Sequence, residues 1–139
     1  MAPGFLLPIA AVVLASLCGC ALPAADQTCA SGFTTRLYLG QDTPAGAVTD
    51  AQWERFVEES VTPQFPEGFT VMQGRGQWRS AAGTLHREET RVIEIIHDDS
   101  AAAHIRAREV GAAYKRRFSQ QSVLVARAPT IQCLYASAG

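Results

Sequence analysis

The sequence predicts an α+β domain in which two helices cover one face of a four-stranded antiparallel sheet. Patterns typical of strand, helix, strand, strand, helix and strand follow one another over residues 33–127, and the two middle strands form one long hairpin. This order is the βαββαβ arrangement of ferredoxin-like folds. A chain of 139 residues has room for one such domain, which we place at 32–136.

The central hairpin is predicted over Phe69 to His97. Both arms are rich in β-branched and aromatic residues, and the turn from Ser80 to Gly83 ends in a glycine that can adopt a positive φ. The second arm ends in a highly apolar run at 92–96, which indicates a central strand. The pairing of the arms stays open, because turns of different length pair different residues.

The first half of the domain supplies a strand and a helix. The strand is predicted over Phe33 to Gly40, and a loop follows at 41–47. A helix then begins at Thr49, because Thr-Asp-Ala-Gln fits a capping box, and it ends before Pro63. Its apolar stripe consists of Trp53, Phe56, Val57 and Val61.

The second half supplies the other helix and the last strand. The helix is predicted from about Ala101 to Phe118, with an N-cap among Asp98, Asp99 and Ser100. The last strand is predicted over Ser122 to Arg127. We expect Pro129 to break its ladder, and residues 130–135 then to add a short edge segment.

Residues 1–20 have the pattern of an export signal. The first charged residue is Asp26, and the apolar run at 5–17 is too short to cross a bilayer. Leu-Cys-Gly-Cys at 17–20 resembles the lipobox of bacterial lipoproteins, with Cys20 as the lipidated residue and 21–31 as a tether. The alternative is ordinary cleavage between 21 and 25. We therefore expect an envelope protein, periplasmic or anchored to the outer membrane by lipid alone, or a secreted one.

Cys29 and Cys133 are predicted to form a disulfide. After export and lipidation of Cys20, these two cysteines remain in an oxidising compartment. The predicted topology puts the end of the last strand beside the start of the first, where the two cysteines fall. Closing a loop of about 100 residues gives roughly 4 to 5 kcal/mol in the chain-entropy model. Two unpaired thiols are the alternative.

The sheet face opposite the helices is one candidate ligand site. Alternation in the strands leaves Arg36, Tyr38 and Glu94 on the open face. It puts four apolar residues on the side of the helices: Leu37, Leu39, Ile93 and Ile95. A glutamate between apolar neighbours needs a partner, and Arg36 is the obvious one. The three residues would form a polar site in an apolar groove, or else part of a homodimer interface.

The hairpin tip is a second candidate. Arg79 and Arg87 could bind an anion or a carboxylate, with Trp78 as a stacking platform and Glu88 beside them. The alternative is cross-strand charge pairing on a solvated edge.

Composition and motifs argue against several function classes. A formal net charge of −1 gives no general basic surface, so a nucleic-acid partner is not expected. His86, His97 and His104 lack the spacing of metal ligands, and the chain has no nucleophile elbow or phosphate-binding glycine loop. We therefore expect no metal and no cofactor, and enzymatic activity has no positive support.

Several segments together resemble a known family. They are 37–40 (Leu-Tyr-Leu-Gly), 76–79 (Gly-Gln-Trp-Arg), 87–90 (Arg-Glu-Glu-Thr) and 114–124. They are similar to small exported bacterial proteins catalogued as domain of unknown function 3574, over nearly all of the chain after Cys29. The resemblance implies an envelope protein and no particular activity.

We expect the protein to bind a small ligand or a partner through its open sheet face. One alternative is a cofactor-independent enzyme of the dimeric α/β-barrel type, with Arg36, Tyr38 and Glu94 around a small organic substrate. The other is a purely structural envelope lipoprotein.

Overall fold

A computed structural model describes residues 27–135, and the predicted export signal with Cys20 lies outside them. The main strands are β1 (Gln27–Gly40), β4 (Thr70–Arg79), β5 (Leu85–His97) and β6 (Leu124–Tyr135). They form an antiparallel sheet in the order β4-β5-β1-β6. The other elements are a small ladder of β2 (Asp42–Thr43) and β3 (Gly46–Ala47), helix α1 (Asp50–Phe56) with a π-helical turn η1 (Val57–Val61), and helix α2 (Ala101–Arg117).

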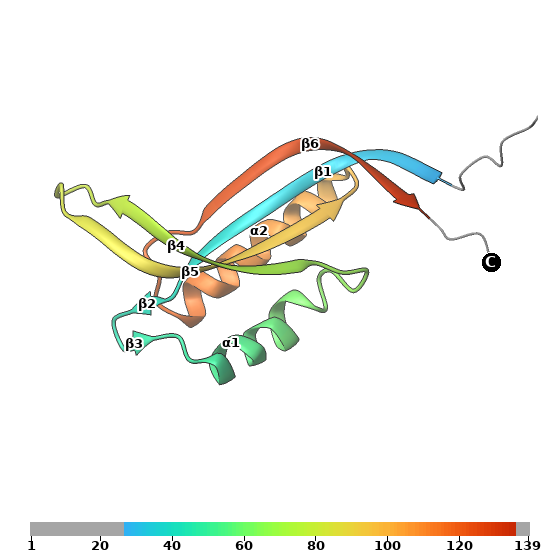
Figure 1. Cartoon of the computed structure of the whole chain (residues 1–139). Helices are drawn as coiled ribbons and strands as arrows, with labels where there is room; N and C mark the ends of the chain where they lie inside the picture. Colours follow the sequence, from blue (N-terminus) through green and yellow to red (C-terminus); the bar gives the residue numbers. More distant parts are fainter. Residues whose placement is uncertain (1–26, 136–139) are drawn as a thin grey trace, which may run out of the picture.

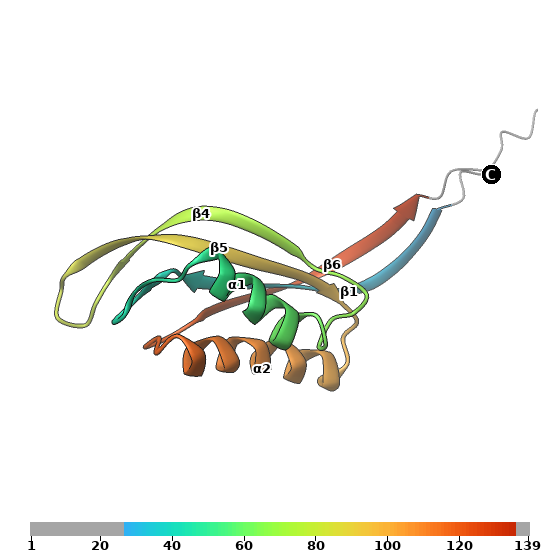
Figure 2. The ribbon, with the colours of Figure 1, turned by 90° about the horizontal axis from the view of Figure 1, so that it is seen from below.

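Both helices lie on the same face of the sheet, as Figure 2 shows. The predicted α+β fold, with four antiparallel strands and two helices, is therefore confirmed. The core between the layers contains the residues predicted to face the helices, which are completely buried: Leu37, Leu39, Ile93 and Ile95. The helices meet them with Trp53, Phe56, Val110 and Tyr114. No helix in the described part of the chain is long and apolar enough to span a bilayer.

Local signals position the helices as predicted. Thr49 caps α1 in a complete capping box with Gln52, and Ser100 caps α2 by accepting a hydrogen bond from the Ala103 amide at 3.1 Å. Gly111 lets α2 lie close to the sheet, because a Cβ there would be 3.3 Å from the Leu37 side chain.

Two strands are longer than the sequence pattern indicates. β1 begins at Gln27 and not at Phe33, so strand structure replaces part of the expected tether. The prediction that Pro129 breaks the last strand is wrong, since β6 runs through it to Tyr135. The reason is that β6 is the edge of the sheet, where a proline nitrogen can face outward.

The added lengths of β1 and β6 pair with each other in a two-stranded arm that extends from the domain (Figure 1). Cys29 lies directly opposite Cys133 in this arm. The two residues form the predicted disulfide, with their Cα atoms 4.1 Å apart.

The β4–β5 hairpin projects at the opposite end of the molecule from the arm (Figure 1). Its register, open at the level of the sequence, pairs Trp78 with His86 and Arg79 with Leu85. The turn spans 80–84, and Gly83 adopts a φ of +83° there. The tip of the hairpin extends beyond the end of β1, whose last pair with β5 joins Gly40 to Thr90.

Candidate ligand-binding site on the open sheet face

The sheet face away from the helices carries a row of aligned residues. Residues that pair directly across strands point to the same face. Tyr38, Val92 and Met72 therefore form one tier, and Gly40, Thr90 and Gly74 form the next. Two further tiers follow towards the tip, Glu88 with Gly76 and His86 with Trp78.

This face is hollowed where the hairpin leaves the rest of the sheet. The hollow encloses about 750 Å³. The sheet contributes Tyr38, Gly40, Thr90, Val92 and Leu124, and the hairpin contributes Gly74, Arg75, Gly76, Gln77, Trp78, Ser80, His86, Arg87 and Glu88. Two loops, 42–44 and 119–122, complete the wall.

The two loops are tied together. Helix α2 ends at Arg117 with Phe118 as its C-cap, and Ser119, with a φ of 51°, turns the chain into the second loop. The side-chain amide of Gln120 then donates a 2.7 Å hydrogen bond to the carbonyl of Asp42. This bond joins the end of α2 to the β2–β3 ladder on the far side of the hollow from the hairpin tip.

The floor of the hollow contains glycines, which leave room above the backbone because they have no side chain. A Cβ on Gly40 would lie 2.6 Å from the carboxyl carbon of Glu88, which means that this side chain rests on the bare backbone of β1. A Cβ on Gly74 would meet nothing within 4 Å. The space above β4 is therefore open beside Gly74, while the space above Gly40 at the end of β1 holds the Glu88 carboxyl group.

Glu88 is the best-positioned polar group in the hollow. Its Oε1 accepts a 2.8 Å hydrogen bond from the indole Nε1 of Trp78. The indole itself stacks on the imidazole of His86, with ring centroids 4.3 Å apart and planes 13° from parallel. The half-buried carboxylate is thus held by an aromatic pair at one end of the hollow, and its second oxygen lies over Gly40.

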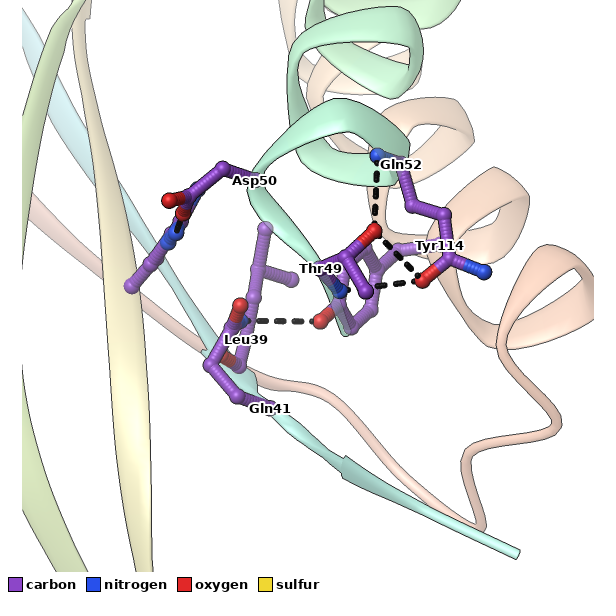
Figure 3. Close-up of polar contacts among 7 residues, drawn as sticks. Leu39, Gln41, Thr49, Asp50, Gln52 and Tyr114 are labelled. Atoms are coloured by element: carbon purple, nitrogen blue, oxygen red, sulfur yellow. Dashed lines mark hydrogen bonds and ion pairs between the residues drawn. The ribbon is translucent and has the colours of Figure 1, made fainter. Parts of the chain in front are cut away.

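The floor is anchored from behind by a buried tyrosine. The Tyr114 hydroxyl donates a 2.7 Å hydrogen bond to the carbonyl of Gly40 and accepts one from the Gln41 amide at 3.0 Å. Figure 3 shows the bond between Gln41 and Tyr114, and Gln41 also donates to the carbonyl of Leu39 at 2.8 Å. Burial raises the pKa of Tyr114 above its ordinary value, so the phenol keeps the proton that it donates.

The predicted site residues divide into two groups. Tyr38, Trp78, Arg87 and Glu88 all line the hollow, although the sequence analysis assigned them to two separate sites. The others do not line it, and they bind each other or the backbone. Arg36 pairs with Glu94 at 2.5 Å, the partner predicted for it, and Arg79 donates to the carbonyl of Gly83 at 2.7 Å.

The sequence analysis did not include the glycines at 40, 74 and 76, or either of the two loops, among the residues of the site. The signal for the glycines was available, because glycine inside a strand often marks a site that another group approaches closely. No signal marked the loops, which reach the hollow only through the folding of α2 and the β2–β3 ladder against the sheet.

A second hollow lies between α1 and the hairpin and encloses about 570 Å³. Its two oppositely charged residues, Asp50 and Arg91, form an ion pair, and the guanidinium also lies 4.8 Å from the centre of the Trp53 ring. Because these groups satisfy each other, this second hollow offers a ligand less than the first. Within residues 27–135, no three histidine, cysteine or acidic side chains are grouped as metal ligands would be.

Comparison with known proteins identifies the family. The model of the family described as "Protein of unknown function (DUF3574)" matches residues 34–133. The chain belongs to DUF3574. The match covers most of the sheet, both helices and every residue that lines the hollow of this DUF3574 protein. No curated protein matches the sequence significantly.

Two solved structures resemble the DUF3574 chain in fold. A phage SAM lyase in complex with S-methyl-5′-thioadenosine has a TM-score of 0.56 and 18% identity, over 76% of this chain and 90% of the lyase. The apo form of a phage SAM lyase has a TM-score of 0.49 and 20% identity, over 78% of this chain and 93% of the lyase. At these identities the likeness concerns the fold alone.

Proposed function

We propose that this protein is an exported, lipid-anchored protein of the bacterial cell envelope that binds a small molecule in the hollow of its open sheet face. The observation that carries the proposal is the half-buried Glu88 carboxylate, held by Trp78 above the glycine floor. A carboxylate, an aromatic pair and apolar surface in one concave site are typical of small-molecule recognition.

Two further observations support the binding role. The hollow is built from three separate parts of the chain, and buried hydrogen bonds from Tyr114 and Gln41 fix its floor. Such a site is formed before the ligand arrives, which lowers the entropic cost of binding. The structurally similar phage SAM lyase was solved with S-methyl-5′-thioadenosine, so a related fold accommodates a molecule of that size.

The binding test is an NMR titration of the ¹⁵N-labelled protein. Three probes are used separately, up to about 10 mM: S-methyl-5′-thioadenosine, 2-phenylethanol and 2-phenylethylamine. We expect at least one of them to shift the Trp78 indole signal and the amide signals of Gly40, Gly74 and Gly76. The indole of Trp53, which lines the second hollow, is the internal control. If every probe leaves the signals of the first hollow unchanged, or shifts only Trp53, the binding proposal fails.

The envelope location rests on the lipobox at 17–20 and on the Cys29–Cys133 disulfide, since structural disulfides persist in oxidising compartments. We expect the protein to fractionate with bacterial membranes, with an intact mass that starts at a lipid-modified Cys20. The Cys20→Ala variant should lose the lipid and the membrane association. A wild-type protein that is soluble and starts between residues 21 and 25 would contradict the anchor and leave the binding role to be judged by the titration.

A further inference from the structure

We infer that the ligand of this hollow is an organic cation with an apolar or aromatic body. The inference rests on the proposed binding function and gives the chemical class of its ligand. The evidence for this class is the set of charged side chains that line the hollow, together with the ion pairs and hydrogen bonds that these side chains already form.

Glu88 forms no ion pair among the described residues, and the hydrogen bond to its Oε1 comes from a neutral indole. A half-buried carboxylate has lost part of its hydration, and a positive charge close to it is the most effective replacement. Among the described residues, no side chain donates a hydrogen bond to the other carboxylate oxygen, which lies above Gly40 in the lining of the hollow. This oxygen is therefore the natural contact for an ammonium, sulfonium or protonated heteroaromatic group.

The arginines of the hollow are the argument for an anionic ligand. Arg75 is paired with a carboxylate, whereas Arg87 has a neutral partner, so for Arg87 the direction of the side chain decides. Arg75 forms an ion pair with Glu89 at 3.0 Å, and the Nε of Arg87 donates to the side chain of Gln77 at 2.9 Å. By register, Arg75 and Arg87 belong to the tiers that point to the other face of the hairpin. Glu88 points towards the open face, so its negative charge determines the preference inside the hollow.

The remaining walls fit an apolar or aromatic body. Trp78 is 42% exposed at one end of the hollow, and an indole ring attracts a cation that lies over its face. Val92 and Leu124 supply aliphatic surface next to Tyr38. A ligand whose cation contacts the Glu88 oxygen above Gly40 would thus cover these side chains with the rest of its surface.

The test compares three probes of one shape and three charges: 2-phenylethylammonium, 2-phenylethanol and 3-phenylpropanoate. We expect the cation to bind about tenfold more tightly than the alcohol, and the anion to bind most weakly, as measured by NMR titration at low ionic strength. Glu88→Gln should remove the preference for the cation while the alcohol binds as before. Glu94→Gln, which changes a carboxylate outside the hollow that pairs with Arg36, is the matched control and should keep the preference.

A second pair of variants moves the carboxylate without changing its charge. In Gly40→Ala the new methyl group occupies the place of the Glu88 carboxyl group, which must shift, so the preference for the cation should fall. In Gly74→Ala the new methyl group meets nothing within 4 Å, and the preference should stay. If all three probes bind the hollow equally, or the anion binds most tightly, the inference is overturned while the binding role stands. If none of these three probes binds while S-methyl-5′-thioadenosine does, the inference is likewise overturned and the binding role stands. If S-methyl-5′-thioadenosine does not bind either, the binding role itself fails.

Discussion

At the scale of single residues, Tyr114 is the link between the core and the candidate site. It lies in α2, on the helix side of the sheet, and its hydroxyl group binds the carbonyl of Gly40. On the opposite side of the sheet, Gly40 forms part of the floor of the hollow. One completely buried side chain therefore holds the backbone on which Glu88 rests. A change in the core at this position is expected to reach the site.

Replacing Tyr114 by phenylalanine should destabilise the protein by about 1 to 3 kcal/mol. The substitution leaves the carbonyl of Gly40 and the side-chain amide of Gln41 with fewer partners inside the protein, and buried polar groups without partners are costly. Urea unfolding measures the change. The control is Tyr38→Phe on the open face, for which we expect less than about 0.5 kcal/mol. Equal effects of the two substitutions would contradict the role of the Tyr114 hydroxyl.

The same tyrosine predicts a pH dependence. Burial raises the pKa of Tyr114 in the folded state above the ordinary value of 10.0, so the folded protein favours the neutral phenol. Its contribution to stability is therefore complete below about pH 10 and is lost as the pH rises further. Unfolding free energies measured between about pH 9 and 11 should fall more steeply for the wild type than for Tyr114→Phe. Parallel curves would show that Tyr114 titrates normally.

The individual residues of the site were predictable to different degrees. Strand alternation and topology were enough to predict that Arg36 pairs with Glu94, because both residues lie on neighbouring central strands. The position of Glu88 over Gly40 was not predictable in this way. It depends on the register of the hairpin, and the register depends on a turn whose length the sequence left open.

At the scale of elements, the contact of α2 with the sheet depends on a missing side chain. Gly111 is buried against Leu37, Val123 and Val125, and a Cβ there would already be in tight contact with the first of these residues. The helix ends in the loop that walls the hollow, so the position of α2 affects the site as well as the core.

Gly111→Leu should destabilise the fold by about 1 to 3 kcal/mol through overpacking, despite the better helix propensity of leucine. Ala102→Leu, at an exposed position near the start of the same helix, is the control and should be close to neutral. Thermal unfolding followed by circular dichroism compares the two variants. A Gly111→Leu protein as stable as the wild type would show that α2 can move away from β1 at no cost.

Local sequence signals predicted the helices well and the strand ends poorly. The capping box at Thr49 and the cap at Ser100 involve residues within three positions of each other, so the sequence alone contains the information. The extension of β1 over 27–32 has no apolar alternation. Those residues become a strand because β6 lies beside them, a contact between segments about 100 residues apart in the chain.

At the scale of the whole molecule, the disulfide should be the largest single contribution to stability at the end of the sheet that carries the arm. It joins residues 104 positions apart, for which the chain-entropy model gives roughly 4 to 5 kcal/mol as an upper figure. We expect reduction to lower the melting temperature by about 10 °C or more. The double variant Cys29→Ser with Cys133→Ser should melt near the reduced wild type and should not respond to the reductant. A wild type that is indifferent to reduction would contradict this expectation.

The topology was predictable as a whole because two independent patterns agreed. The order of the elements predicted that the first and last strands are neighbours, and the positions of Cys29 and Cys133 required the same neighbours. The hollow was not predictable at this scale. It arises where the hairpin extends past Gly40 and two loops rise beside it, which is a property of the assembled sheet.

The position of Pro129 in the edge strand of the sheet affects how readily the sheets of two molecules can pair with each other. β6 is a strand of 12 residues at the edge of the sheet, and a long edge invites the strands of other chains to add to it. The ladder with β1 continues on both sides of Pro129, which fits a proline nitrogen that faces away from β1. The outer row of amide donors is then interrupted near its middle. A residue that has the pattern of a strand breaker should thus reduce the tendency of this edge to pair with strands of other chains.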